Sequence, residues 1–275
     1  MSTRSIYEMA EAIAPGWEHW RARIEDVVSP VRGWMLAGLA PRPGDTVLEL
    51  AAGAGDTGFE AAAVVGERGR LISTDFSPAM LDVARRRGAE LGLGNVDCRL
   101  MDAERIELDA DTVDGVLCRF GYMLMPDPAG ALAETRRVLR QGGRLALAVW
   151  GAPERNPWIT IGFGLLVEHG HLPPPDPGDP GPFAMADAEG TRALLADAGF
   201  PSVRTEEIPV RFAFRDLDDY TTFSTDTGGP AALALRGMPE HEREDLRGQL
   251  HAAFAPFEAG GRYELPGVAL AAVAS

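Results

Sequence analysis

Apolar and polar positions follow a helical period near the start of the chain and change to short apolar runs after residue 40. Over residues 5–40 the spacing predicts helices, and Pro30 should divide them in two because proline cannot donate the backbone hydrogen bond of a helix interior. From Thr46 onward, short apolar runs alternate with amphipathic stretches. Strands that alternate with helices predict a parallel sheet with right-handed crossovers.

The same pattern places the individual elements. Strands are expected at residues 46–50, 70–74, 96–100, 113–118, 144–150, 203–214 and 267–274. Helices are expected from about Thr57, from Ser77 or Pro78 through Arg87, and over 128–139, 158–170, 188–198 and parts of 216–257. Residues 173–182 are rich in proline and predict a stiff, extended connector.

The first predicted strand runs into a glycine-rich turn and then a helix, over Val47–Gly58. Gly53 and Gly55 lack a Cβ, so the turn can adopt positive φ and let a ligand approach the backbone, while the following helix offers free N–H groups. With Gly58, the spacing also matches a dinucleotide fingerprint, and Asp75 follows about 20 residues later. The loop therefore predicts a nucleotide-like ligand without choosing which one.

Two features favour a ligand other than a nicotinamide dinucleotide. Glu49 ends the strand where a dinucleotide fold usually has an apolar residue, and this carboxylate is costly to bury unless a cation such as a ligand ammonium lies nearby. The second strand ends in the run 75–81, DFSPAML, and the third turn carries Met101-Asp102-Ala103. In these residues the chain resembles the class I S-adenosylmethionine-dependent methyltransferases, most closely the ubiquinone and menaquinone biosynthesis C-methyltransferases. The resemblance covers roughly residues 43–151.

The resemblance implies a fold and a division of the chain. The fold is α/β, a Rossmann-like doubly wound seven-stranded sheet of order 3-2-1-4-5-7-6, with an antiparallel last strand and helical lid insertions. The implied parts are an N-terminal helical cap (1–40), a cofactor-binding core (41–150, continued at 187–214 and 263–275), a lid insertion (151–186) and a second helical insertion (215–262). The insertions leave the carboxyl edge of the sheet, so they should cover the ligand site.

The resemblance also assigns a set of residues that bind S-adenosylmethionine. Glu49 would meet the ammonium of its methionine, Gly53 and Gly55 would approach the methionine and ribose, and Asp75 would accept both ribose hydroxyls. A charged acceptor suits a diol, because hydrogen bonds to a charge are the stronger ones. The alternative for Asp75 is a helix-capping acid.

Further residues complete this implied cofactor site. Phe76 would lie against the adenine, while Asp102 and the backbone amide of Ala103 would contact the adenine edge. The alternative for Asp102 is a turn residue. The remaining members are Ala51, Met80 and Arg119, and Ala51 departs from the family, which usually has glycine there.

Methyl transfer itself is expected to depend mainly on positioning, because the sulfonium is already an activated leaving group. Tyr122, after the fourth strand, and His169, on the lid helix, are the candidate catalytic bases, with a structural role as the alternative for each. The segment Met123-Leu124-Met125 either packs or lines an acceptor pocket.

Composition excludes several functional classes. All 26 basic residues are Arg, so a Walker P-loop and Schiff-base enzymes, which need Lys, are excluded. The net charge of −15 argues against nucleic acid and anionic membranes as partners and favours a small-molecule methyl acceptor. No metal is expected, because His169 and His171 lack further ligands at metal-binding spacing.

Some expectations about the setting of the protein follow. No secretory signal and no long apolar run are present, which predicts a cytoplasmic protein. A bacterial source, a role in secondary metabolism and a homodimer are further expectations. Two alternatives to the enzyme stay open at this point: an NAD(P)-dependent Rossmann dehydrogenase, and a non-catalytic regulatory protein that binds S-adenosylmethionine.

Overall fold

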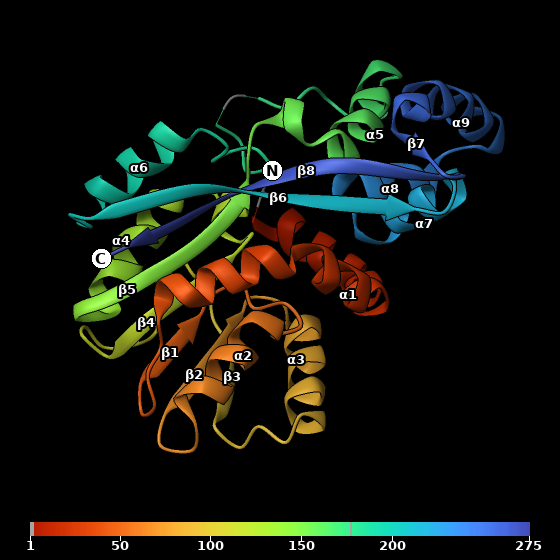
Figure 1. The fold of residues 1–275 in the computed structure, drawn as a ribbon. Helices are drawn as coiled ribbons and strands as arrows, with labels where there is room; N and C mark the ends of the chain where they lie inside the picture. The colour runs from red at the N-terminus through yellow and green to blue at the C-terminus, as the bar shows by residue number, and fades with distance from the viewer. Residues whose placement is uncertain (1–2, 177) are drawn as a thin grey trace.

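The computed structural model describes residues 3–176 and 178–275 and contains one mixed sheet with helices on both faces (Figure 1). The strands are β1 (Thr46–Glu49), β2 (Arg70–Asp75), β3 (Val96–Leu100), β4 (Val113–Arg119), β5 (Leu139–Trp150), β6 (Val203–Phe214), β7 (Glu258–Ala259) and β8 (Arg262–Ala274). Their order is β3-β2-β1-β4-β5-β8-β6, and β7 pairs only with β8. Since β8 is the predicted seventh strand, the predicted order is confirmed, and β7 is a short addition that the pattern did not predict.

Strand direction also agrees with the prediction. The strands β3, β2, β1, β4 and β5 pair in parallel, and β8 runs antiparallel to both β5 and β6. The β6–β8 pairing runs from Val203↔Ala274 to Phe214↔Tyr263, whereas β8 pairs with β5 only from Ala274 to Ala269. The β6–β8 ribbon therefore projects beyond the rest of the sheet, toward the helices α7, α8 and α9 in Figure 1.

Helices cover both faces of the sheet. They are α1 (Thr3–Leu39), α2 (Asp56–Val65), α3 (Pro78–Glu90), α4 (Pro128–Val138), α5 (Pro157–Glu168), α6 (Ala188–Asp197), α7 (Leu217–Thr227), α8 (Pro230–Gly237) and α9 (Glu240–Phe254). In Figure 1, α1, α2 and α3 lie on the near face, and α4 and α6 lie on the far face. Buried strand residues such as Leu48, Leu117 and Leu147 form the core between these layers.

The N-terminal region corrects one prediction. Residues 3–39 form a single helix, α1, with Pro15 and Pro30 inside it, so the predicted break at Pro30 is wrong. The Asp26 carbonyl, which a residue other than proline at position 30 would have bonded, accepts instead from the Ser29 hydroxyl at 2.8 Å. Val28, Val31 and Met35 are buried on both sides of Pro30, so packing on the sheet also holds the helix together.

Two other boundaries differ from the pattern. Helix α4 ends at Val138 and β5 begins at once at Leu139, with a register shift between its pairs Val113↔Leu139 and Gly115↔Arg144. Residues 140–143, which lay between the predicted helix and the predicted strand, are therefore part of β5, where Gly142 has a φ of 78°. The described residues of 173–182 contain no helix or strand, as predicted, and residue 177 of this connector lies outside the described residues.

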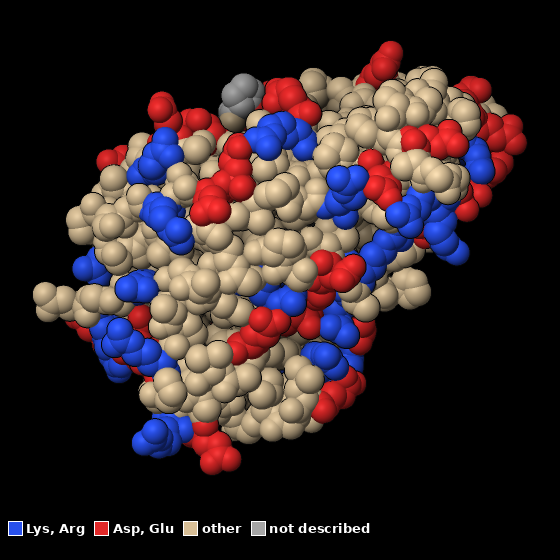
Figure 2. Space-filling view, viewed as in Figure 1, with Lys and Arg blue, Asp and Glu red and all other residues tan. Residues whose placement is uncertain are grey.

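No helix in the described residues is long and apolar enough to cross a bilayer. On the face shown in Figure 2, Arg side chains are interspersed with Asp and Glu side chains and form no extended basic patch. That face therefore lacks the electrostatic footprint of a nucleic-acid-binding surface.

Candidate cofactor and acceptor site

The turn after β1 has an open side. Gly53 and Gly55 have φ values of 55° and 85°, in the left-handed region that favours glycine. A Cβ built at Gly53 would meet no atom within 4 Å, whereas one at Gly55 would lie 2.4 Å from Cζ of Phe59. Gly55 is thus required by packing against the helix, and Gly53 leaves room for a ligand beside the backbone.

Asp75 ties this turn to the next one. Its carboxylate accepts from the Gly53 amide at 2.9 Å and from the Ser77 amide at 2.9 Å. The side chain is buried, and this burial raises the pKa of Asp75 above its usual value despite the backbone hydrogen bonds. One carboxylate at the end of β2 therefore joins the glycine turn to the start of α3.

Glu49 lies beneath the first turn of α2. Its carboxyl accepts from the Gly58 amide at 2.7 Å and from the Ser73 hydroxyl at 3.1 Å. Burial without an ion-pair partner raises the pKa of Glu49 to about 8, and the nearby Arg119 only partly opposes this effect. The surroundings of this carboxyl therefore favour its protonated form.

The turns after β1 and β4 each contain a residue with a strained backbone. Ala51 and Phe120, which follow β1 and β4, have φ values of 50° and 60° although neither is glycine. A Cβ at Gly121 would lie 2.7 Å from Cβ of Ala51, so the two turns are in close contact. Ala51, where the family usually has glycine, therefore holds a left-handed conformation and fills a tight space.

The Ala51→Gly variant is expected to be more stable than the wild type by about 0.5 kcal/mol. Relief of about 1–2 kcal/mol of left-handed strain should exceed the roughly 0.5–1 kcal/mol of chain entropy that glycine adds to the unfolded state. Urea unfolding measures the difference. Ala40→Gly is the matched control, because the exposed Ala40 also has a φ of 50°. A loss of stability in Ala51→Gly alone would show that packing of the Ala51 methyl outweighs the strain.

The remaining predicted cofactor residues surround Asp75. The Met101 amide donates to the Asp75 carbonyl at 3.0 Å, which brings the third turn beside the second. Asp102 is exposed and accepts from the Glu104 amide at 2.9 Å, a turn contact, and Ala103 is half-buried. Phe76 has 37% of its surface exposed, and the Met80 amide donates to the Ser77 hydroxyl. The structure thus gathers these residues at one edge, next to the glycine turn.

Helix α1 supplies charged residues that the sequence pattern did not single out. Arg21 pairs with Asp56, the first residue of α2, at 2.7 Å. Glu25 pairs with Arg119 at the end of β4 and with Arg32 at 2.6 Å. The spacing of residues 21, 25 and 32 places them on one helical face, and this charged stripe was the signal that could have been found.

Comparison with known proteins identifies the family of this chain. The model of the ubiE/COQ5 methyltransferase family matches residues 9–165, more than half of the chain. The chain belongs to this family. It is therefore an S-adenosylmethionine-dependent methyltransferase, and the dehydrogenase alternative is set aside.

One sequence relative illustrates the family match, and two solved structures illustrate the fold. The ubiquinone/menaquinone biosynthesis C-methyltransferase UbiE of Klebsiella pneumoniae (strain 342) is 32% identical over 173 residues, 59% of this chain and 68% of that protein. A putative methyltransferase of Bacillus halodurans has the same fold, with a TM-score of 0.61 at 21% identity, over 88% of this chain and 97% of that one. A Haemonchus contortus N-methyltransferase, solved with S-adenosylhomocysteine, has a TM-score of 0.55 at 16% identity, over 89% of this chain and 52% of that one.

The glycine turn of this methyltransferase fits its cofactor. The open side of Gly53 leaves space, and two buried oxygens beside the turn, Asp56 Oδ2 and Thr57 Oγ1, have no hydrogen-bond partner among the described residues. Buried polar atoms are normally paired, so oxygens like these indicate a place for a polar ligand or water. Asp75, the acid at the end of β2, is a charged acceptor of the kind that a ribose diol would need.

The side chains of the two candidate bases have hydrogen-bond partners on helices. Tyr122 is fully buried, its hydroxyl is 2.6 Å from the Thr135 hydroxyl on α4, and burial raises the pKa of Tyr122 well above its usual value. His169 ends α5, where its Nε2 lies 3.0 Å from Oε1 of Gln249 on α9. These contacts favour the structural alternative for both residues, since neither side chain contacts the glycine turn or Asp75 in the described part of the chain.

An aromatic cluster stands at the carboxyl ends of β4 and β5. It comprises Phe120, Trp150, Trp158, Phe212, Phe223 and Trp20. Phe120 and Trp150 stack with centroids 4.1 Å apart, and Trp158 of α5 stacks on Phe212 at 3.8 Å. Met123 is buried in the core, while Leu124 is 46% exposed. The sequence had pointed to the segment after β4, but most of these rings come from other elements.

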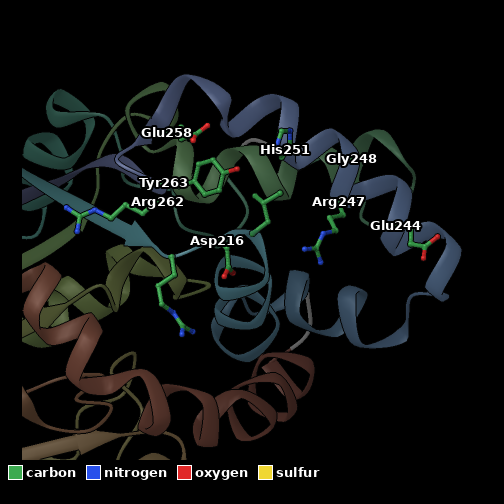
Figure 3. Close-up of a pocket in the computed structure, with 11 residues that line it drawn as sticks. Asp216, Glu244, Arg247, Gly248, His251, Glu258, Arg262 and Tyr263 are labelled. Atoms are coloured by element: carbon green, nitrogen blue, oxygen red, sulfur yellow. The ribbon is translucent and has the colours of Figure 1, made fainter.

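A cleft of about 480 Å³ lies between the start of α7, α9 and the β7–β8 hairpin. Figure 3 shows the residues that line it. Its arginines already have acidic partners: Arg215 pairs with Asp219 at 3.1 Å, Arg247 with Asp218, and Arg262 with Glu264. No residue of the glycine turn lines this cleft. The cleft is therefore separate from the glycine turn, and each of its three arginines is paired with an acid.

Proposed function

We propose that this methyltransferase transfers the methyl group of S-adenosylmethionine to a small organic acceptor with a flat, apolar face. The observation that carries the proposal is the aromatic cluster at the carboxyl ends of β4 and β5, where Phe120 stacks on Trp150 and the Cζ atom of Arg119 lies 5.8 Å from the Phe120 ring centroid. Ring faces such as those of Phe120 and Trp158 attract planar apolar molecules through stacking and burial. The net charge of −15 adds support, because it argues against polyanionic acceptors such as nucleic acid.

The names of the relatives agree with a small-molecule acceptor. The Klebsiella protein is named for ubiquinone and menaquinone biosynthesis, and a Clavibacter sepedonicus relative is a demethylmenaquinone methyltransferase. For this chain the acceptor class is a proposal that rests on the aromatic cluster and on its nearness to the cofactor residues.

The chain contributes to the reaction mainly by binding and orienting the two reactants. The bound cofactor supplies an activated methyl on a sulfonium. Asp75 and the glycine turn would hold the nucleoside, and the aromatic cluster would hold the acceptor against it. Orientation of this kind can be worth roughly 7–11 kcal/mol, so no strong protein base is required unless the acceptor must lose a proton first.

The proposal predicts methylation of small aromatic acceptors and not of macromolecules. Incubation with cofactor labelled in its methyl group should label members of a phenol and hydroquinone panel and leave bulk tRNA and histones unlabelled. For an acceptor found in this way, Trp158→Leu should raise KM about tenfold without changing S-adenosylhomocysteine affinity, because stacking contributes roughly 0.5–1.5 kcal/mol beyond area burial.

Trp34→Leu is the matched control for this test. Trp34 lies on α1 outside the aromatic cluster, and its Nε1 donates to Glu206 at 2.8 Å. Its replacement should leave the acceptor KM unchanged. Strong labelling of tRNA or histones, with none of the small aromatics, would contradict the proposed acceptor class while leaving the family assignment intact.

A further inference from the structure

We propose that Arg21 of α1 binds the methionyl carboxylate of the cofactor, while Asp56 takes the methionyl ammonium. The family resemblance implied Glu49 for the ammonium, but both oxygens of the Glu49 carboxyl already accept hydrogen bonds, from the Gly58 amide and the Ser73 hydroxyl. The inference rests on the methyltransferase function and extends it to a residue outside the glycine turn. It starts from the ion pair between Nη1 of Arg21 and Oδ1 of Asp56, 2.7 Å apart, with side chains only 26% and 14% exposed. This pair joins α1 to the first residue of α2, directly after Gly55.

The ion pair has unused hydrogen-bonding capacity on both sides. Among the side chains that the structure describes, Asp56 is the one partner of Arg21, and it engages only Nη1 of the guanidinium. Oδ2 of Asp56 is buried without a partner, as is Oγ1 of Thr57, whose side chain is almost fully enclosed. A half-buried carboxylate with an orphaned oxygen and an arginine with several N–H donors can each bind a further charged group, and opening the direct pair between them is then compensated on both sides.

An α-amino acid group is chemically complementary to this pair. It carries a carboxylate and an ammonium close together, so it can insert between Arg21 and Asp56 with each charge facing its opposite. No charge is then left buried and unpaired, which is the costly outcome when an enclosed ion pair opens. A planar guanidinium also matches a carboxylate in a bidentate geometry.

The neighbouring arginine is less available for this role. Arg119 is bound by Glu25, and Glu25 is held in turn by Arg32 at 2.6 Å. Arg32 also pairs with Glu60, so this set of four side chains is already closed. Moving Arg119 to a ligand would break its ion pair with Glu25 and open this closed set. Arg21, in contrast, can bind a carboxylate while its original partner turns to the ammonium.

The test compares two ligands that differ in the amino acid group. S-adenosylhomocysteine carries it and 5′-methylthioadenosine does not, and calorimetry measures both affinities. Arg21→Gln should lose about tenfold to a hundredfold in affinity for S-adenosylhomocysteine, because a hydrogen-bonded charge is lost, and less than threefold for methylthioadenosine. Arg21→Lys should recover part of the loss.

Arg86→Gln is the matched control. Arg86 also pairs with α1, through Glu18 at 2.7 Å, but on the exposed side of α3. The Arg86→Gln variant should bind both ligands like the wild type. Equal losses for both ligands in Arg21→Gln would overturn the inference, since Arg21 would then act only by holding α1 in place, and an unchanged S-adenosylhomocysteine affinity would overturn it as well.

A ligand-side experiment keeps the test valid if Arg21→Gln does not fold. Wild-type protein should bind decarboxylated S-adenosylhomocysteine about tenfold to a hundredfold more weakly than the parent compound, and Arg21→Lys should show a smaller difference. Equal affinities of the wild type for the two compounds would overturn the inference. Failure of the wild type to bind S-adenosylhomocysteine at all would instead contradict the cofactor assignment itself.

Discussion

Replacement of Asp75 by alanine is expected to weaken S-adenosylhomocysteine binding by about a hundredfold or more. If Asp75 accepts from the ribose diol, the variant loses two hydrogen bonds to a charge, each worth about 1.5–3 kcal/mol. The same carboxylate also holds the amides of Gly53 and Ser77 at 2.9 Å, so the glycine turn loses its tie to α3. Calorimetry measures the affinity, and circular dichroism reports whether the fold is retained.

The control for Asp75 lies on the same stretch of chain. Asp82 is on α3 and exposed, and its one ion pair among the described side chains is with Arg85 at 2.8 Å, so Asp82→Ala should bind like the wild type. Asp75→Asn should fall between the wild type and Asp75→Ala, because the amide keeps one acceptor oxygen and loses the charge. An affinity within threefold of the wild type for folded Asp75→Ala would assign this residue to turn structure alone.

The ligand-free protein is expected to lose stability as pH rises from about 5 to 8, and Glu49→Gln is expected to remove most of this loss. The folded-state pKa of Glu49 is raised to about 8 from its ordinary value of 4.5, because the carboxyl is buried. Between these two values the folded protein holds a proton that the unfolded chain has released. Stability from this group is therefore complete below about pH 4.5 and falls by up to about 1.4 kcal/mol per pH unit until pH 8.

Thermal unfolding at several pH values tests this expectation. The wild-type Tm should fall relative to that of Glu49→Gln over this window, by roughly 2–4 °C for each kcal/mol. Glu67→Gln is the control, since Glu67 is exposed and should follow the wild-type curve. Parallel curves for the wild type and Glu49→Gln would show that Glu49 is already ionised at neutral pH.

The two acids at the strand ends illustrate what a local pattern can predict. Glu49 and Asp75 each follow a buried strand, and parallel strands bring their carboxyl ends to one edge of a sheet, so their nearness followed from the strand order. Their hydrogen-bond partners did not follow. The contact of Glu49 with Ser73 depends on how β1 and β2 align, and the sequence pattern does not specify that alignment.

The candidate base Tyr122 shows that position in the sequence does not predict where a side chain points. Tyr122 follows β4 in sequence, which suggested a place in the site, but its ring turns into the core and its hydroxyl meets Thr135 on α4. Position along the chain predicts which edge a residue leaves, whereas side-chain direction depends on the local turn. Here a short 3₁₀ helix, Tyr122–Leu124, sets that direction.

The sequence by itself determined the alternation of strands and helices and the glycine turn, because both depend on short-range patterns of apolar residues, glycines and acids. The family resemblance that these residues carry also implied the strand order. Only the tertiary structure decided that α1 stays whole across Pro30 and brings Arg21 and Glu25 to the turn. Only the structure also showed that rings from α1, β4, β5, α5, β6 and α7 meet in one cluster. These contacts join residues far apart in sequence, and their geometry depends on how whole helices pack on the sheet, which no local period encodes.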